Sequence, residues 1–309
     1  MLGSVVQVHL SLPRKSKPTK IIQKIERVNK AKNLPLVSIC ICNFNMGRYI
    51  YDALNSVCMQ LDSQYEVVVI DDGSSDNSLD ELNRLKTKYN FLKIFPYARD
   101  SKRMLGATRN LSIKHSLGKY VVLHIDADDI WEDGIHEWCE NAIKLSLKFN
   151  DEVFISGNQI NFTNKRFIED FGGYKNMGWT EDRDLWMRLA SKNKLIFVNH
   201  PVFRKRMPLV FSDKLKKFPR VNWQTLQADL RSKKRIVAEA PELFFDSLIN
   251  IGKRGIYNDI FRIICFIPGL IVAIYNGSNY HQKNEISASD YQKYKSMKTK
   301  SFDEWLRVD

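Results

Sequence analysis

Residues 120–129 read YVVLHIDADD, an apolar run that leads directly into three aspartates. An earlier stretch of the same kind, YEVVVIDDGSS, occupies residues 65–75. Continuous apolar runs of this length are typical of strands that are covered on both faces. The two stretches therefore predict two buried strands, each ending in an acidic turn.

Outward from these strands, short apolar runs alternate with amphipathic segments. We expect strands at residues 36–42, 65–70, 91–95, 120–125 and 153–156, and helices at residues 49–61, 76–89, 107–117 and 132–147. Such alternation with short links predicts an α/β fold, in which a mostly parallel sheet is flanked by helices.

Beyond about residue 200 the alternation stops and the apolar residues recur at helical spacing. We therefore divide the chain into three parts. The division predicts a basic N-terminal extension (1–35), an α/β catalytic domain (36–199) and a basic, mainly helical C-terminal region (200–309).

The formal net charge of +13 is distributed unevenly, with +7 over residues 1–35, −3 over 36–199 and +9 over 200–309. A nucleic-acid enzyme more often carries its positive charge over the active cleft, so we expect no nucleic-acid partner. Basic flanks around a neutral core favour an anionic membrane surface, and ordinary solvated lysines are the alternative.

Ile260–Tyr275 (IFRIICFIPGLIVAIY) is the most apolar stretch, 16 residues long with Pro268-Gly269 in its middle. A spanning helix needs about 20 apolar residues, so we expect a helix in the membrane interface or a re-entrant hairpin. A helix packed on the core is the alternative. Together with five cysteines that suggest no disulfide framework and a start that suggests no signal peptide, this predicts a cytoplasmic protein, peripheral or monotopic at the cytoplasmic membrane face.

The acidic residues fall where ligands gather in an open parallel sheet, at the carboxyl ends of strands. Asp71 and Asp72 close one predicted strand, and Asp126, Asp128 and Asp129 close another. Carboxylates brought together repel each other unless cations neutralise them, and oxygen ligands without His or Cys favour Mg²⁺ or Mn²⁺. Such a metal, completed by substrate phosphates, stabilises a departing nucleoside diphosphate. For Asp71 alone, capping of the turn is the favoured interpretation.

Five segments in order resemble family 2 of the glycosyltransferases, which has the GT-A fold. They are VSICICNFNMGRYIYDALNSV (37–57), VVVIDDGSSDNS (67–78), ATRNLSIKHSLGKYVVLHIDADDIW (107–131), FGGY (171–174) and TEDRDLWMRL (180–189). The resemblance implies a nucleotide-binding α/β half followed by an acceptor-binding half, and transfer with inversion at the anomeric carbon.

The resemblance also implies donor-binding residues. Asp72 matches the carboxylate that accepts a hydrogen bond from the donor's base, with Asn43 and Asn45 beside it. Arg109 matches an arginine near the donor that reaches the base or the diphosphate, and an ion pair with a neighbouring Asp is the alternative. Asp126 matches a donor-contacting acid.

For the reaction itself, the resemblance implies that Asp128 is the metal ligand of an Asp-x-Asp motif. Asp182 matches the catalytic base, and Glu181 supports it. A base within hydrogen-bond reach must take the acceptor's proton. The alternative for the acidic pair is capping of the helix that follows. Asp129 and Trp131 are expected to shape the loop.

The sequence thus predicts an inverting, metal-dependent glycosyltransferase that uses Mn²⁺ or Mg²⁺. It would move a sugar from a nucleotide-sugar donor to a lipid-linked (polyprenyl-linked) or cell-surface glycan acceptor. Two alternatives stay open: a nucleotidyltransferase of related α/β fold, and a non-catalytic membrane-surface binding module. The early Gly-rich phosphate loop that the first would show is absent, and the intact acidic motifs disfavour the second.

Overall fold

The computed structural model describes residues 34–157, 160–178, 181–200, 204–207, 219, 222–223, 226, 230, 236–249, 256–276 and 288–307. The predicted N-terminal extension lies almost entirely outside these residues. So does Thr180 of the last family-like segment.

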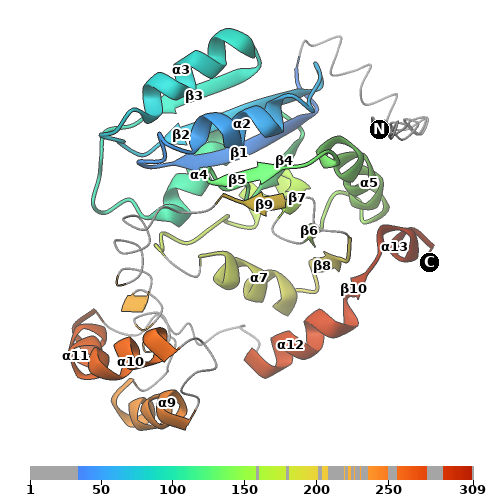
Figure 1. Ribbon diagram of the computed structural model, residues 1–309. Helices are drawn as coiled ribbons and strands as arrows, with labels where there is room; N and C mark the ends of the chain where they lie inside the picture. Colours follow the sequence, from blue (N-terminus) through green and yellow to red (C-terminus); the bar gives the residue numbers. More distant parts are fainter. Residues whose placement is uncertain are drawn as a thin grey trace, which may run out of the picture.

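An eight-stranded sheet forms the centre of the molecule, in the order β10-β8-β6-β7-β4-β1-β2-β3 (Figure 1). Its strands are β1 (Val37–Asn43), β2 (Tyr65–Asp71), β3 (Leu92–Pro96), β4 (Tyr120–Leu123), β6 (Phe154–Gly157), β7 (Ile160–Asn164), β8 (Leu195–Val198) and β10 (Thr299–Lys300). Every pairing is parallel except those of β7, which runs antiparallel to both β4 and β6. The predicted mostly parallel α/β sheet is confirmed.

Helices cover both faces of this sheet because alternate strand residues supply two separate cores. One core holds Ile39 and Ile41 of β1, and the other holds Cys40 between them. The first core packs against α2 (Ile50–Cys58), α3 (Ser78–Lys88), α5 (Ile135–Lys148) and α13 (Phe302–Arg307). The second packs against α4 (Leu105–His115), α6 (Lys165–Asp170), α7 (Glu181–Ser191) and α12 (Ala288–Met297).

A buried carboxylate ties the central strands together at the edge where they begin. Glu66 in β2 is 4% exposed and accepts hydrogen bonds from Ser38 Oγ of β1 at 2.6 Å and from the backbone N–H of Leu117 at 2.5 Å. The backbone N–H of Gly118 in turn donates to Ser38 Oγ at 2.8 Å. A buried charge is tolerated when it is hydrogen-bonded in this way, and the network fixes how β1, β2 and the approach to β4 align.

A second, two-stranded sheet follows the acidic turn directly. β5 (Asp129–Trp131) pairs antiparallel with β9 (Arg204–Arg206), and Trp131 lies opposite Arg204. The predicted helix at 132–147 therefore begins later, at Ile135, because the preceding residues are held in this ribbon and in the turn after it.

The last part of the chain returns to the α/β unit. β10 joins the edge of the sheet beside β8, and Trp305 of α13 lies in the first core. The sequence division places this segment in the C-terminal region, and the structure packs its strand and helices against the α/β unit. The two-residue strand carries no periodic signal that could have revealed it.

Three further helices form a unit with its own small core, drawn in orange away from the sheet in Figure 1. They are α9 (Ile236–Ile249), α10 (Ile256–Ile264) and α11 (Phe266–Asn276). The most apolar stretch of the sequence is thus divided at Cys265 into two short helices. No helix among the described residues is long and apolar enough to cross a membrane.

Candidate active site

The acidic turns meet at one edge of the sheet because the strands before them are parallel neighbours. β1 pairs with β2 on one side and with β4 on the other. Asn43, the last residue of β1, lies in register with Asp71, the last residue of β2. The residues after β4 emerge at the same edge, where His124 has a left-handed backbone (φ 67°) that ends the strand.

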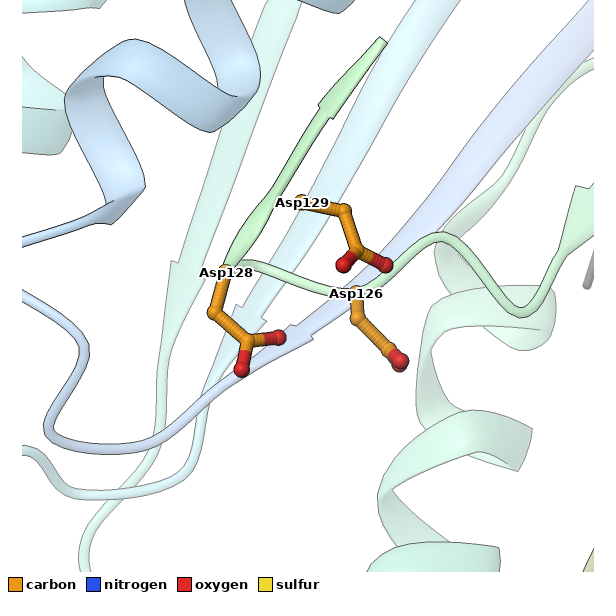
Figure 2. A group of neighbouring side chains, drawn as sticks. All are labelled: Asp126, Asp128 and Asp129. Carbon is orange, nitrogen blue, oxygen red and sulfur yellow. The ribbon is translucent and has the colours of Figure 1, made fainter. Parts of the chain in front are cut away.

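Three aspartates cluster where the chain passes from β4 to β5: Asp126 and Asp128 lie on the turn between them, and Asp129 begins β5 (Figure 2). A carboxylate oxygen from each of Asp126, Asp128 and Asp129 lies within 4.8 Å of the others. The Asp126 side chain is 31% exposed, whereas Asp128 and Asp129 are buried. A set of hard oxygen donors at this spacing fits a divalent cation such as Mg²⁺ or Mn²⁺. The structure thus brings together the predicted donor contact Asp126 and the predicted metal ligand Asp128.

Arg204 of β9 reaches into this cluster. Its Nη1 lies 2.5 Å from Asp129 Oδ2 and 4.0 Å from Asp126 Oδ2. The β5–β9 pairing places it there, since Arg204 lies opposite Trp131 in the ribbon. The guanidinium offsets part of the negative charge that three adjacent carboxylates would otherwise accumulate. Sequence reasoning missed Arg204, because nothing local in residues 204–206 indicates pairing with a strand 75 residues away.

The predicted base lies in the first turn of α7, beside a buried arginine from α4. Arg109 Nε donates to Glu181 Oε1 at 3.2 Å, and Arg109 Nη2 lies 3.5 Å from Asp182 Oδ2. The same Asp182 oxygen lies 3.4 Å from His124 Nδ1. The other oxygen, Asp182 Oδ1, is buried and has no hydrogen-bond partner among the described residues. Arg109 thus forms an ion pair of the kind given as the alternative, and its contact with a donor stays a prediction.

Burial sets the protonation of the two groups that flank Asp182. Burial, followed by the negative charge of Asp182, raises the pKa of Glu181 to about 7, although Arg109 acts in the opposite direction. Burial lowers the pKa of His124, although Asp182 favours its charged form. Near pH 7 His124 is therefore mostly neutral, and Glu181 is present in both its protonated and its ionised form.

The loops after β1 and β2 are held together by polar side chains. Asp71 accepts hydrogen bonds from Asn43 Nδ2 at 2.6 Å and from the backbone N–H of Ser74 at 3.0 Å, which is the turn-capping role favoured for it. Asn45 Oδ1 accepts from the backbone N–H of Ser75 at 2.8 Å. In this structure Asn43 and Asn45 brace the two loops, and their contact with a donor stays a prediction.

Two arginines engage Asp72, the predicted base-binding carboxylate. Arg103 Nε donates to Asp72 Oδ1 at 2.5 Å, and Arg99 forms an ion pair with the other oxygen. The Arg99 guanidinium also lies over the Phe44 ring, 4.5 Å from its centroid. Both arginines come from the loop between β3 and α4, and sequence reasoning missed them. Guanidinium groups suit phosphate as well as carboxylate, so this end of the site can bind an anionic group.

Comparison with known proteins identifies the family. The family model described as Glycosyl transferase family 2 matches residues 38–201, more than half of the chain. The chain belongs to glycosyl transferase family 2. The predicted resemblance is thereby confirmed, and the acidic cluster, Arg109 and the Glu181–Asp182 pair all fall inside the matched range. Arg204 lies outside it.

Several curated relatives of this family-2 chain are glycosyltransferases. An uncharacterized glycosyltransferase of Nostoc is 38% identical over 96 residues, covering 31% of this chain and 29% of the relative. The cholesterol galactosyltransferase of Borreliella burgdorferi is 34% identical over 109 residues, 35% of this chain and 29% of that protein. An Escherichia coli glucosyltransferase that acts on GlcNAc-diphosphoundecaprenol is 29% identical and covers 44% and 50%. The chain therefore spans half or less of the length of these relatives.

Solved structures are similar at lower identity. TarS of S. aureus in complex with UDP-GlcNAc is 17% identical, with a TM-score of 0.47 over 78% of this chain and 80% of that one. A mannosyltransferase of Pyrobaculum calidifontis in complex with GDP-Man and Mn²⁺ is 15% identical, with a TM-score of 0.48 over 88% and 85%.

Proposed function

We propose that this family-2 chain is an inverting, metal-dependent glycosyltransferase that moves a sugar from a nucleotide-sugar donor to a hydroxyl group of a glycan acceptor. The observation that carries the proposal is the link between the acidic cluster and the Glu181–Asp182 pair. His124 lies 3.4 Å from Asp182 and only two residues before Asp126, so both acidic groups face one site. An acceptor hydroxyl and a departing diphosphate need these two groups on opposite sides of the anomeric carbon.

At the donor end, Asp126 and Asp128 would hold Mn²⁺ or Mg²⁺. Such an ion supplies positive charge to a departing diphosphate. Asp72 would accept a hydrogen bond from the donor's base. Arg103 and Arg99, which engage Asp72 in this structure, add positive charge at that end.

At the acceptor end, Asp182 would act as the base. Its Oδ1 is buried and unpartnered among the described residues, so it can accept the hydroxyl proton. As the acceptor oxygen forms its bond to the anomeric carbon, the bond from that carbon to the diphosphate breaks and the proton passes to Asp182. Arg109 and His124 contact the other oxygen, Oδ2, and so orient the carboxylate. Glu181 shares Arg109 and supports the base.

We further propose a lipid-linked glycan acceptor, such as a polyprenyl-linked precursor, at the cytoplasmic face of the membrane. The E. coli relative acts on a diphosphoundecaprenol-linked sugar and the Borreliella relative on cholesterol. The net charge of +9 over residues 200–309 supports attraction to an anionic membrane surface.

Product analysis with a panel of UDP- and GDP-sugars, Mn²⁺ or Mg²⁺, and polyprenyl-diphosphate sugars as acceptors tests the proposal. We expect release of the nucleoside diphosphate and an acceptor that is heavier by one sugar, with the anomeric configuration inverted. Release of pyrophosphate would instead support a nucleotidyltransferase. Failure of a folded sample to turn over or bind any nucleotide in the panel would support the non-catalytic module.

A further inference from the structure

Helix α10 has its polarity reversed relative to an ordinary surface helix. Its two charged residues, Asp259 and Arg262, are only 0% and 3% exposed. The apolar side chains of Tyr257 and Ile264 are 78% and 71% exposed, and Ile260 is also exposed. Asp and Arg are rarely buried to this extent. The exposed isoleucines of α10 are not part of the small core.

Helix α11 continues the same pattern. Ile267, Ile271, Ile274 and Tyr275 are exposed, at the i, i+4, i+7 and i+8 spacing that puts side chains on one side of a helix. Ala273 of this helix is buried in the small core instead. We call the exposed isoleucines of α10 and α11 the apolar face, and Tyr257 and Tyr275 lie near its two ends in the sequence.

We propose that the apolar face docks the protein onto a lipid bilayer that carries anionic headgroups. The proposal deepens the membrane location given above and rests on it, but it does not depend on the transfer chemistry. α10 and α11 have 9 and 11 residues, well short of the length of about 20 that spans a bilayer. Short helices that expose a wide apolar surface lie in the plane of the interface, with their apolar side chains among the acyl chains.

The ends of the apolar face suit the same location. Tyr257 and Tyr275 each combine an apolar ring with a polar hydroxyl, and tyrosine is enriched at the membrane–water boundary for this reason. In the sequence, Lys253 and Arg254 precede α10, with Gly255 between them and Ile256.

Charge favours a lipid surface over a second copy of the chain. Residues 200–309 carry a net charge of +9, and the whole chain carries +13. Two such regions brought face to face would repel each other, whereas a bilayer with anionic lipids attracts basic residues near its surface. Because the attraction is electrostatic, added salt should weaken it.

Flotation of the full chain with vesicles tests the docking. We expect the protein to float with phosphatidylglycerol–phosphatidylcholine vesicles at low salt, and to float less in 0.5 M NaCl or with pure phosphatidylcholine. The double variant Ile264→Glu/Ile271→Glu should bind at least tenfold more weakly. Both side chains are well exposed, at 71% and 63%, so the variant should keep its fold, which circular dichroism and the melting temperature check.

The matched control is Met59→Glu/Leu117→Glu, which adds the same charges at side chains 67% and 58% exposed on the α/β unit. It should float like the unmodified chain. Equal flotation of the two double variants would overturn the proposal, as would an unmodified chain that stays with the buffer. A dimer in light scattering that the Ile264→Glu/Ile271→Glu change abolishes would assign the apolar face to a second copy instead. Flotation without turnover of any donor would leave docking standing and refute the proposed function.

Discussion

Replacing the predicted base by its amide, Asp182→Asn, should remove catalysis while leaving the protein folded. The change keeps the shape of the side chain and removes the carboxylate, which takes the proton from the acceptor hydroxyl. General-base catalysis contributes about 10²–10⁴-fold, so kcat should fall by that factor. At about 1.4 kcal/mol per decade this equals about 3–5 kcal/mol of transition-state stabilisation.

Stability should change far less, for reasons visible in the contacts of Asp182. Its distance of 3.5 Å from Arg109 Nη2 is at the limit of a hydrogen bond, and Arg109 keeps its contact with Glu181 Oε1 at 3.2 Å. The negative charge of Asp182 also raises the pKa of Glu181, after burial, so its removal relieves a repulsion. We therefore expect the free energy of unfolding to change by no more than about 1 kcal/mol.

Steady-state kinetics with the preferred donor, and calorimetric titration with its nucleoside diphosphate, measure these effects. The dissociation constant of the nucleoside diphosphate should stay within about threefold of its value in the unmodified chain, whereas kcat should fall by the factor given above. Asp184→Asn is the matched control, because Asp184 lies two residues along the same helix and pairs with Lys175 and Arg188 at 2.6 and 2.7 Å. It should lower the melting temperature but keep kcat within about tenfold. A kcat for Asp182→Asn within tenfold of the unmodified enzyme would refute the role of Asp182 as base.

Three further substitutions test residues that support the site. Arg204→Gln should lower the free energy of metal-free unfolding by about 3–5 kcal/mol, since it breaks the ion pair between Arg204 and the buried Asp129 carboxylate. Thermal shift should show a larger stabilisation by Mn²⁺ than in the unmodified chain. Glu181→Gln should make the protein gain less stability as the pH falls. A carboxyl whose pKa is raised from 4.5 to about 7 contributes stability that is fully present below pH 4.5 and is lost as the pH rises through 7. Melting temperatures between pH 5 and 8 check this, and equal pH slopes in both proteins would contradict it. Gly106→Ala would place a Cβ in steric clash with the backbone oxygen of Lys175 and should cost about 1–3 kcal/mol in denaturant unfolding. Its control, Gly178→Ala, places a Cβ no nearer than 3.9 Å to any described atom outside its neighbours in the chain, and should change stability by less than about 0.5 kcal/mol.

The central strands could be predicted from the sequence because they are buried on both faces and read as unbroken apolar runs. β2 was expected at 65–70 and forms at Tyr65–Asp71. β4 was expected to run to Ile125 but ends at Leu123, because the left-handed backbone of His124 turns the chain out of the sheet. That conformation does not change the hydrophobic pattern of the sequence, and the prediction of β4 rested on that pattern.

The strands that were missed depend on partners far away in the sequence. β7 (INFTN) is short, mixes polar and apolar residues, and is stabilised by pairing with β4 and β6. β9 reads RKR and, among the described residues, pairs with β5 alone. Propensity cannot predict such strands, because tertiary pairing decides them.

The same distinction applies to the site. The acidic residues lie directly after strong strands, so sequence position alone places Asp126 and Asp128 at the sheet edge. The cationic partners of the acidic residues come from other segments of the chain. Arg204 of β9 contacts Asp129 across 75 positions. Arg103 contacts Asp72 across 31 positions. A lone arginine in a basic chain gives no local signal for such contacts, so only the structure reveals that these arginines belong to the site.

Metal-dependent binding of a nucleoside diphosphate tests the central claim most directly. Calorimetric titration of UDP and GDP, with and without Mn²⁺, would be made on the unmodified chain, on Asp128→Asn, and on Asp80→Asn, which changes an aspartate in the first turn of α3 as the control. The account predicts that one nucleotide binds only when the metal is present, that Asp128→Asn abolishes this binding, and that Asp80→Asn preserves it. Binding that is indifferent to the metal, or equally tight in Asp128→Asn, would contradict the assignment of the acidic cluster as the metal and diphosphate site.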